Sequence, residues 1–398
     1  MAIGNSDLPS FPMARRCPHH PPPEYAELRA QGAAVRVSFL GTPVWAITRH
    51  AEARDVLTDS RVSTDPASPG HPFGALAATA DRMAGQLTDM DPPDHSAHRR
   101  MLISEFGVRR IREMEPDIER LVDGLLDGMA ASGAADLVEA YGLPVASAVM
   151  CQLLGVPERD HAFFHDRACA MLGGVFSSRD ADVARMEILA YLDDLVRSHE
   201  PGQNGIIDRL VTIRRDTGEP THEAIVGMCF MLLLAGHHTT ATMIPLGVYT
   251  LLDHPDQLAQ LRAKPALWPA AVDELLRFHS IVDWMSFDRV ATADIDVSGE
   301  RIHAGEGIFV LGAAANRDER AFTRPDDFDI HRRSRHHLAF GVGIHQCLGQ
   351  SLARAELEIS YRRLFDRFPT IRVDAPADGL VFKYDAAMFG LQELPVTW

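Results

Sequence analysis

One cysteine lies in a setting that favours a reactive thiolate. Residues 340–349 read FGVGIHQCLG, which places Cys347 on a glycine-loosened loop just ahead of an apolar pattern typical of a helix. The free amides at the start of that helix and the positive end of its dipole favour an ionised sulfur. Phe340 can cover the sulfur from water. We therefore expect Cys347 to act as a thiolate ligand.

The same loop indicates what the thiolate binds. Gly341 and Gly349 remove side-chain bulk, so a flat cofactor could lie against the backbone. A thiolate so placed can be the axial ligand of haem iron, where it donates electron density that promotes cleavage of the O–O bond. Taken alone, the segment could also be a buried cysteine in a glycine-rich turn. The pattern F-x-x-G-x-H-x-C-x-G resembles the cysteine-ligand signature of the cytochrome P450 family.

A second motif lies in a long apolar helix pattern. Residues 235–240 read AGHHTT, with Gly236 and Thr239 three residues apart on one helix face. Gly236 would leave a gap for a small ligand, and Thr239 would donate a hydrogen bond into it or to a helix carbonyl. Alternatively, the two residues are an ordinary glycine and threonine of a core helix, with no contact to a ligand. The segment resembles the oxygen-activating motif of the family, which implies catalytic roles for Ala235, Gly236, His238 and Thr239.

The motif departs from the family pattern at His238, because the residue before the threonine is usually an acid. Histidine can relay protons near neutral pH, so one interpretation keeps the relay with a changed pH dependence. In the other, His238 points away from the pocket. Both interpretations are compatible with the sequence.

Two further groups of residues match the family in order. Glu274 and Arg277 stand at i and i+3 on one helix face, a spacing that often means only a surface ion pair. The resemblance implies that this pair is buried and is joined by Arg332, with the structural role of pinning the cysteine loop. It also implies that the haem propionates are held by four basic residues, namely His95, Arg99, Arg289 and His345. Each of these could by itself be a solvated basic residue.

The substrate pocket is weakly specified. Leu232 belongs to an apolar stripe on the oxygen-side helix, and such a stripe is more often core than pocket wall. The resemblance implies a pocket lined by Phe73, Leu232, Ile281, Val282, Met388 and Phe389. We expect an apolar, bulky substrate, with Asp283 as a possible hydrogen-bonding group for a substrate hydroxyl or amine.

The elements predicted around these motifs are mostly helical. The 398 residues show no linker or repeat, so we expect a single domain, 1–398, with a mixed α/β lobe over about 1–90 and a helix-rich lobe for the rest. The fold class is mainly α with small β-sheets (α+β), and the resemblance implies the triangular P450 fold. We predict helices over 23–30, 50–58, 268–278 and 348–365, strands over 34–37, 43–47, 289–298 and 302–311, and an irregular loop over 64–86.

Composition limits the partners. A net charge of −16 opposes binding to nucleic acid or to anionic membranes. The longest apolar stretch, 224–236, is too short to span a bilayer, and the N-terminus is not a secretory signal, so we expect a cytoplasmic protein. Five scattered cysteines argue against a disulfide framework. Two basic clusters could form a patch for an acidic electron donor: Arg99, Arg100, Arg109 and Arg110, and Arg332, Arg333 and Arg335.

The resemblance implies a monomeric monooxygenase with haem b (iron protoporphyrin IX). It would insert one oxygen atom of dioxygen into a secondary metabolite, such as a polyketide or terpenoid, or into a xenobiotic. The chain has no flavin or nicotinamide fingerprint, so electrons would come from a ferredoxin and an NAD(P)H-dependent ferredoxin reductase.

Three alternatives remain open at this point. A haem-thiolate enzyme of altered chemistry, such as a peroxygenase or a catalyst of oxidative coupling or rearrangement, is motivated by His238. A non-catalytic haem-binding module is another. A zinc protein using His336, His337, His345 and Cys347 is the third, although the i, i+2 spacing of the last two matches no common zinc site.

Overall fold

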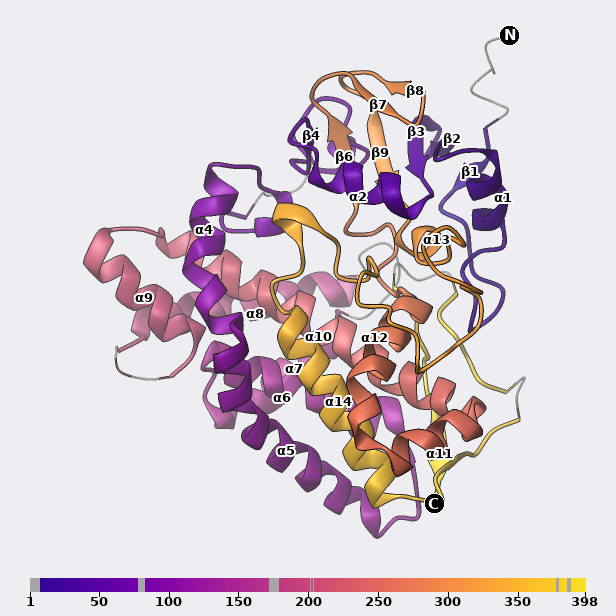
Figure 1. The fold of residues 1–398 in the computed structure, drawn as a ribbon. Coiled ribbons are helices and arrows are strands. Elements are labelled where there is room, and N and C mark those ends of the chain that lie inside the picture. The colour runs from indigo at the N-terminus through magenta and orange to yellow at the C-terminus, as the bar shows by residue number, and fades with distance from the viewer. Residues whose placement is uncertain are drawn as a thin grey trace. The chain divides into compact units, whose positions relative to one another are not determined.

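The computed structural model describes residues 8–77, 83–171, 179–200, 202, 204–376, 379–384 and 388–398 (Figure 1). The described residues group into two compact units. Unit 1 contains those of 8–77, 88–96 and 273–347, and unit 2 contains those of 83–87, 97–272 and 348–398. Two helices, α4 (Asp94–Leu102) and α12 (Trp268–His279), have residues in both units.

Unit 1 is built on a six-stranded mixed sheet with the order β1-β2-β3-β9-β6-β4. Its strands are β1 (Ser10–Phe11), β2 (Ala34–Phe39), β3 (Thr42–Ile47), β4 (Val62–Ser63), β6 (Asp288–Ala291) and β9 (Gly307–Val310). The central strand β9 pairs parallel with β3 and antiparallel with β6. All four residues of β9 are buried, as expected for a strand covered on both faces. The helices of this unit are α1 (Glu24–Gln31), α2 (His50–Thr58), α3 (Gly74–Ala77) and α13 (Gly312–Ala315).

The strands predicted over 289–298 and 302–311 are wrong as continuous elements, because each is divided in two. Between β6 and β9 the chain forms a separate hairpin of β7 (Ile295–Val297) and β8 (Glu300–Ile302). The hairpin turns at Ser298 and Gly299, whose φ angles of 52° and 90° are both positive. The halves next to the turn, β7 and β8, therefore pair with each other in the hairpin. The halves farther from the turn, β6 and β9, pair in the large sheet.

Unit 2 is helical apart from one small sheet of order β10-β11-β5. Its main helices are α5 (Val108–Ala130), α6 (Leu143–Leu154), α7 (His161–Ala170), α8 (Arg179–Ser198), α9 (Ile206–Thr217), α10 (His222–Asp253), α11 (Pro255–Ala263) and α14 (Gln350–Arg367). The sheet consists of β5 (Ala134–Asp136), β10 (Arg372–Val373) and β11 (Pro395–Thr397). Figure 1 shows α10 passing among the other helices, and it packs against α6, α8 and α14.

Helix α10 is the core helix of unit 2. Thr221 caps it by accepting a hydrogen bond from the Ala224 amide at 3.2 Å. The helix continues to Asp253, well past the apolar run at 224–236 that we expected to be too short for a bilayer. By length and composition it could cross a membrane, but 67% of its apolar window is buried inside the protein, as in the core helix of a globular protein.

Several other predicted elements are close to those observed. Helix α2 spans the predicted residues 50–58, and α1, β2, β3 and α12 match within two residues at each end. The helix predicted from 348 begins at Gln350, so Cys347 lies three residues before it. The loop predicted over 64–86 contains the short helix α3, and its residues 78–82 lie outside the described residues.

Candidate functional site

The cysteine loop of unit 1 is shaped by glycines with left-handed backbone conformations. Gly341 and Gly343 have φ values of +62° and +83°. A Cβ atom at Gly343 would lie 2.7 Å from the Leu57 carbonyl oxygen of α2, so only glycine fits there. The Cys347 amide donates to the Phe340 carbonyl at 2.8 Å, which closes the loop. Cys347 itself is exposed, so its sulfur is presented to a ligand rather than packed in the core.

A buried asparagine that the sequence did not single out anchors the approach to this loop. Asn316 is fully buried. Its side-chain oxygen accepts from the Leu338 amide at 2.8 Å, and its side-chain nitrogen donates to the Ser280 hydroxyl at 2.8 Å. Because these partners are distant in sequence, no local pattern could reveal the contact.

The predicted ion network is present in unit 1. Arg277 binds both carboxylate oxygens of Glu274 at 2.8 Å, and both side chains are fully buried. The Arg332 Nε atom reaches Glu274 Oε1 at 3.0 Å. Arg277 also donates to the Asn316 and Pro325 carbonyls, each at 2.8 Å. The network therefore ties α12 to the segments that lead into the cysteine loop, with its charges paired and hydrogen-bonded.

Two of the four predicted propionate partners, His95 and His345, lie close together. The rings of His95 and His345 are 4.3 Å apart, and His95 is 1% exposed. Arg99 follows His95 by one turn of α4 and is half-buried.

Arg289 of β6 is a buried cation without a carboxylate partner. It is 5% exposed and donates to the Thr64 hydroxyl at 3.3 Å and to the Asp288 and Ser286 carbonyls at 2.7 and 3.3 Å. Burial lowers the pKa of its guanidinium. Among the residues that the structure describes, this side chain forms no ion pair, although the carboxylates of Asp288 and Asp91 act on it electrostatically. A buried cation of this kind is suited to an anionic group of a ligand.

The middle of α10 carries the predicted oxygen-activation motif. Thr239 donates to the Ala235 carbonyl at 2.7 Å, the helix-carbonyl alternative considered from the sequence. Ala235 is exposed although most of the helix around it is buried. The gap predicted at Gly236 is wrong, because a Cβ there would lie 2.2 Å from Met150 Sδ of α6. Gly236 therefore permits close packing of α6 against α10.

The surroundings of Thr239 include two groups with shifted pKa values. The His238 Nε2 atom lies 3.2 Å from the Ala168 carbonyl of α7, and burial lowers the pKa of its imidazole. This contact favours the interpretation in which His238 is directed to a neighbouring helix. Glu356 of α14, which the sequence analysis did not single out, is hydrogen-bonded to Thr240, and burial raises its pKa well above the ordinary value. The direction of this shift favours the protonated carboxyl group, and its partner Thr240 directly follows Thr239 in the chain.

The predicted pocket residues occupy different environments. Leu232, Ile281 and Phe389 are at most 6% exposed, whereas Val282 and Met388 are half-buried. Half-buried Phe73 packs against an aromatic core of unit 1.

Asp283, considered as a hydrogen-bonding group for a substrate, is already bonded within unit 1. Its two oxygens accept from the Tyr25 hydroxyl at 2.7 Å and from the Ala313 amide at 2.9 Å. These two bonds fix the position of the carboxylate, and its role toward a substrate stays a prediction.

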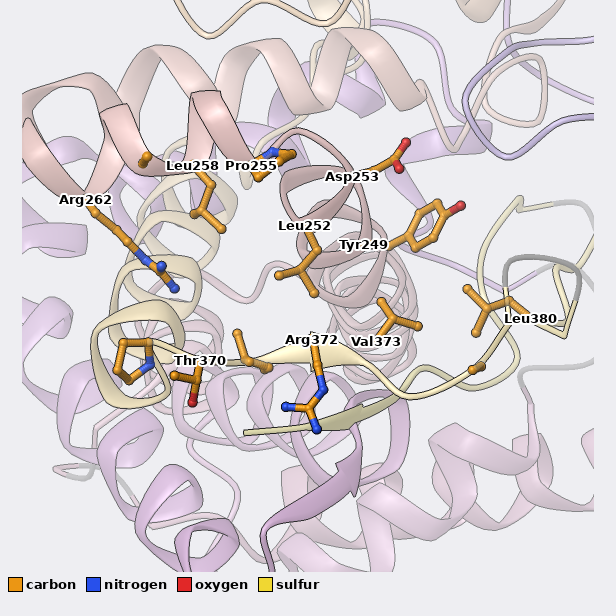
Figure 2. Close-up of a pocket in the computed structure, with 14 residues that line it drawn as sticks. Tyr249, Leu252, Asp253, Pro255, Leu258, Arg262, Thr370, Arg372, Val373 and Leu380 are labelled. Atoms are coloured by element: carbon orange, nitrogen blue, oxygen red, sulfur yellow. The ribbon is translucent and has the colours of Figure 1, made fainter.

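A surface pocket of unit 2 is lined by none of the predicted site residues (Figure 2). It has a volume of about 510 Å³ and is lined by the end of α10, by α11 and by the segment around β10. Figure 2 shows Tyr249, Leu258 and Arg372 among its walls. Because none of the candidate cofactor or substrate residues lines it, this pocket is not the predicted site.

The comparisons with known proteins decide the family. Residues 181–394 match the family model described as Cytochrome P450. Vitamin D3 dihydroxylase of Streptomyces griseolus is 46% identical over 399 residues, 99% of this chain and 98% of the relative. The 20-oxo-5-O-mycaminosyltylactone 23-monooxygenase of Streptomyces fradiae is 43% identical over 98% of this chain and 92% of the relative. The chain belongs to the cytochrome P450 family. The crystal structure of cytochrome P450 MoxA from Nonomuraea recticatena matches with a TM-score of 0.91 and 42% identity over 98% of each chain.

Membership confirms the predicted fold class and the enzyme class. This P450 is a haem monooxygenase. The residues present fit a haem in two respects. Cys347 is exposed on a glycine-shaped loop, where its sulfur could bind the iron. Arg289 of unit 1 is a buried cation that forms no ion pair, and the acid groups of a haem need such a cationic partner. Within the described residues, the histidines and cysteine of the zinc alternative do not bring their ligand atoms together, whereas the ligand atoms of His165, Cys169 and His237 lie within 4.8 Å of one another.

Proposed function

We propose that this P450 inserts one oxygen atom of dioxygen into an apolar, bulky small molecule, using haem b bound through the Cys347 thiolate. The observation that carries the proposal is the cysteine loop, where positive φ angles at Gly341 and Gly343 and the Cys347 to Phe340 backbone bond hold an exposed cysteine. When bound, the haem would supply oxygen activation, to which the Cys347 thiolate would contribute electron density.

The chain would hold the haem from several sides. We assign Cys347 to the iron and Phe340, Gly341 and Gly349 to the surface next to the ring. His95, Arg99, Arg289 and His345 would hold the propionates. For Arg289 this is supported by its burial without a carboxylate partner. The role of Glu274, Arg277 and Arg332 would be to fix the loop through their buried ion network.

The chain would manage protons through the exposed turn of α10. Thr239 donates to the Ala235 carbonyl, and rotation of its hydroxyl would let it donate a hydrogen bond into the space beside this exposed turn instead. Gly236 would keep α6 and α10 in register beside this turn. His238 stands where the family has an acid, and its contact with the Ala168 carbonyl would direct the ring toward α7.

The substrate class is proposed from the relatives and from the apolar residues of the predicted pocket. Two relatives are named for vitamin D3 and for 20-oxo-5-O-mycaminosyltylactone. We propose a secondary metabolite or a xenobiotic of comparable apolar character. Phe73, Leu232, Ile281, Val282, Met388 and Phe389 would contact it. Electrons would come from a ferredoxin and its NAD(P)H-dependent reductase, and the protein would be a cytoplasmic monomer.

The optical difference spectrum of the dithionite-reduced protein with carbon monoxide tests the central assignment. We expect a strongly red-shifted Soret band in the wild type, because an axial thiolate donates charge to the iron. Cys347→His should keep haem but lose this band. Cys17→Ser, a half-buried thiol elsewhere in unit 1, is the matched control and should retain it. A wild type that binds haem without the red-shifted band would refute the thiolate assignment.

A further inference from the structure

Three metal-ligating side chains of unit 2 converge outside the residues assigned above. His165 and Cys169 belong to α7 and His237 belongs to α10. Their ligand atoms all lie within 4.8 Å of one another. The His165 Nε2 and Cys169 Sγ atoms are 3.8 Å apart. None of the three has a role in the proposed monooxygenase site.

The arrangement follows from helix geometry. His165 and Cys169 are four residues apart, so their side chains share one face of α7. Helix α7 packs against α10, which supplies His237 from the facing surface. Two ligands at i and i+4 on one helix with a third from a neighbouring helix is a common way to build a metal site in a helical protein.

His237 is the strongest indication of a ligand. It is fully buried, and neither ring nitrogen has a hydrogen-bond partner among the residues that the structure describes. Burial, with smaller contributions from His238 and His165, lowers its pKa to about 3, so the ring is neutral at pH 7. A buried imidazole without partners is costly, by about 1–3 kcal/mol for each polar group left unsatisfied. A metal ion at the cluster would satisfy one of the two nitrogens.

His165 is held in a form ready for coordination. Its Nδ1 atom lies 3.1 Å from the buried Ser147 hydroxyl of α6. The tautomer that donates from Nδ1 to Ser147 leaves a lone pair on Nε2, the atom that faces Cys169. Metal-binding histidines usually donate their second ring nitrogen to such a partner, which fixes the orientation of the ring.

We propose that His165, Cys169 and His237 bind one zinc ion, with a water molecule as the fourth ligand. Imidazole nitrogen and thiolate sulfur are the donors that zinc takes in proteins. Tetrahedral zinc with bonds of about 2.0–2.3 Å needs ligand atoms roughly 3.3–3.7 Å apart, so side-chain rotations that close the cluster by about 1 Å suffice. Binding would form a Zn–S bond, and the Cys169 thiol proton would leave to solvent.

The surrounding charges are compatible with a bound cation. Zinc with one thiolate and two neutral imidazoles carries a single positive charge. The carboxylates of Asp166 and Glu139 act electrostatically on Cys169, and both favour a cation there, whereas the ammonium of Lys383 opposes it. Since the ion would join α7 to α10, its binding should stabilise the folded protein as any ligand specific for the native state does.

The test uses tag-free holoenzyme equilibrated with zinc chloride, in which zinc per haem and zinc-edge X-ray absorption are measured. We expect one zinc per chain, with one sulfur at about 2.3 Å and nitrogen ligands at about 2.0–2.1 Å. Cys169→Ser and His237→Asn should each weaken zinc binding at least tenfold. Cys17→Ser, the matched thiol control, should leave the affinity unchanged. Each variant is first shown to be folded by its carbon monoxide spectrum.

A second measurement on the wild type does not depend on any variant. Zinc should slow alkylation of Cys169 by iodoacetamide, located by peptide mass spectrometry, and should not slow that of Cys17. Zinc bound without a sulfur ligand, equal affinity in Cys169→Ser and the wild type, or unprotected Cys169 at saturating zinc would each overturn the proposal.

Discussion

At the scale of single residues, His71 and Asp288 show how burial controls charge beside Arg289. Their Nε2 and Oδ2 atoms are 3.3 Å apart, and the His71 side chain is fully buried. Burial and then the nearby Arg289 charge lower the pKa of His71 to about 4. Burial raises the pKa of Asp288 to about 6. Between these values both groups are neutral, so the contact is not an ion pair despite its short distance.

The two residues should have opposite effects on the pH dependence of stability. His71, with an ordinary pKa of 6.5, binds its proton more readily in the unfolded chain, so it makes stability fall as the pH falls from 6 to 4. Asp288, with an ordinary pKa of 3.8, binds its proton more readily in the folded protein, so it makes stability rise as the pH falls from 6 to 4. Each contributes about 1.4 kcal/mol per pH unit, and in the wild type they offset each other.

Urea unfolding at pH 4, 5 and 6 tests this pair. Relative to the wild type, the free energy of unfolding of His71→Gln should rise by about 1.4 kcal/mol for each pH unit lowered, and that of Asp288→Asn should fall by about the same amount. The comparison concerns slopes only, so a uniform loss of stability in either variant does not affect it. Slopes that move in the same direction in both variants would contradict the assignment.

At the scale of elements, the turn before Cys347 depends on Gly343 for two reasons. Its φ is +83°, and a Cβ atom would lie 2.7 Å from the Leu57 carbonyl. Gly218, which ends α9, also has φ +83° but has no atom within 4 Å of such a Cβ. Alanine at either position carries the backbone cost of about 1–2 kcal/mol, and only Gly343→Ala adds the clash.

Alanine substitutions at Gly343 and Gly218 provide a matched experiment on the cysteine loop. We expect Gly343→Ala to lose a large fraction of the red-shifted carbon monoxide band per haem, because the loop must shift away from α2. Gly218→Ala should keep the full band and lose only stability, measured by urea unfolding. Equal band intensities in the two variants would mean that the close approach to Leu57 does not position the cysteine loop.

The packing of α6 on α10 can be tested at Gly236. Gly236→Ala should destabilise the protein by about 1–3 kcal/mol, since the new methyl overlaps Met150 Sδ. The double variant Gly236→Ala/Met150→Ala should be more stable than the sum of the single effects predicts, because the second change removes the overlap. Gly124→Ala on α5 has no neighbour within 4 Å and should gain up to about 1 kcal/mol. If the effects of Gly236→Ala and Met150→Ala on the free energy of urea unfolding were additive, the new methyl group at position 236 would not contact Met150.

What could be predicted from the sequence depends on whether the signal is local. Helix α2 and the pairing of Glu274 with Arg277 follow from spacing along a few residues, and both are observed. The burial of the pair was implied only by the family resemblance, because its spacing alone indicates a surface ion pair. The division of the strands at β7 and β8 was missed, because an apolar alternation does not reveal which partner each half pairs with. Asn316, and the cluster of His165, Cys169 and His237, were missed because their contacts join distant segments.

At the scale of the whole molecule, an excess of acidic residues must coexist with the binding of an electron donor. The net charge of −16 would repel an acidic ferredoxin unless a local positive surface compensates. The cluster predicted at Arg332, Arg333 and Arg335 divides in the structure. Arg332 is bound to Glu274 with its side chain 10% exposed, whereas Arg333 is exposed and the Arg335 side chain is 83% exposed, 3.6 Å from Asp273.

Within this cluster, only the exposed residues Arg333 and Arg335 can therefore contribute to steering a donor. We expect Arg333→Glu/Arg335→Glu to lower the second-order rate of haem reduction by ferredoxin about tenfold at low ionic strength. The measurement is stopped-flow formation of the carbon monoxide band. The difference should shrink toward 0.5 M salt, since surface charges are screened over less than about 10 Å above 0.1 M. The control, Arg120→Glu/Arg159→Glu, makes the same change in net charge at two exposed arginines that are paired with aspartates in unit 2. If the control slows reduction equally, net charge rather than a local patch governs the encounter.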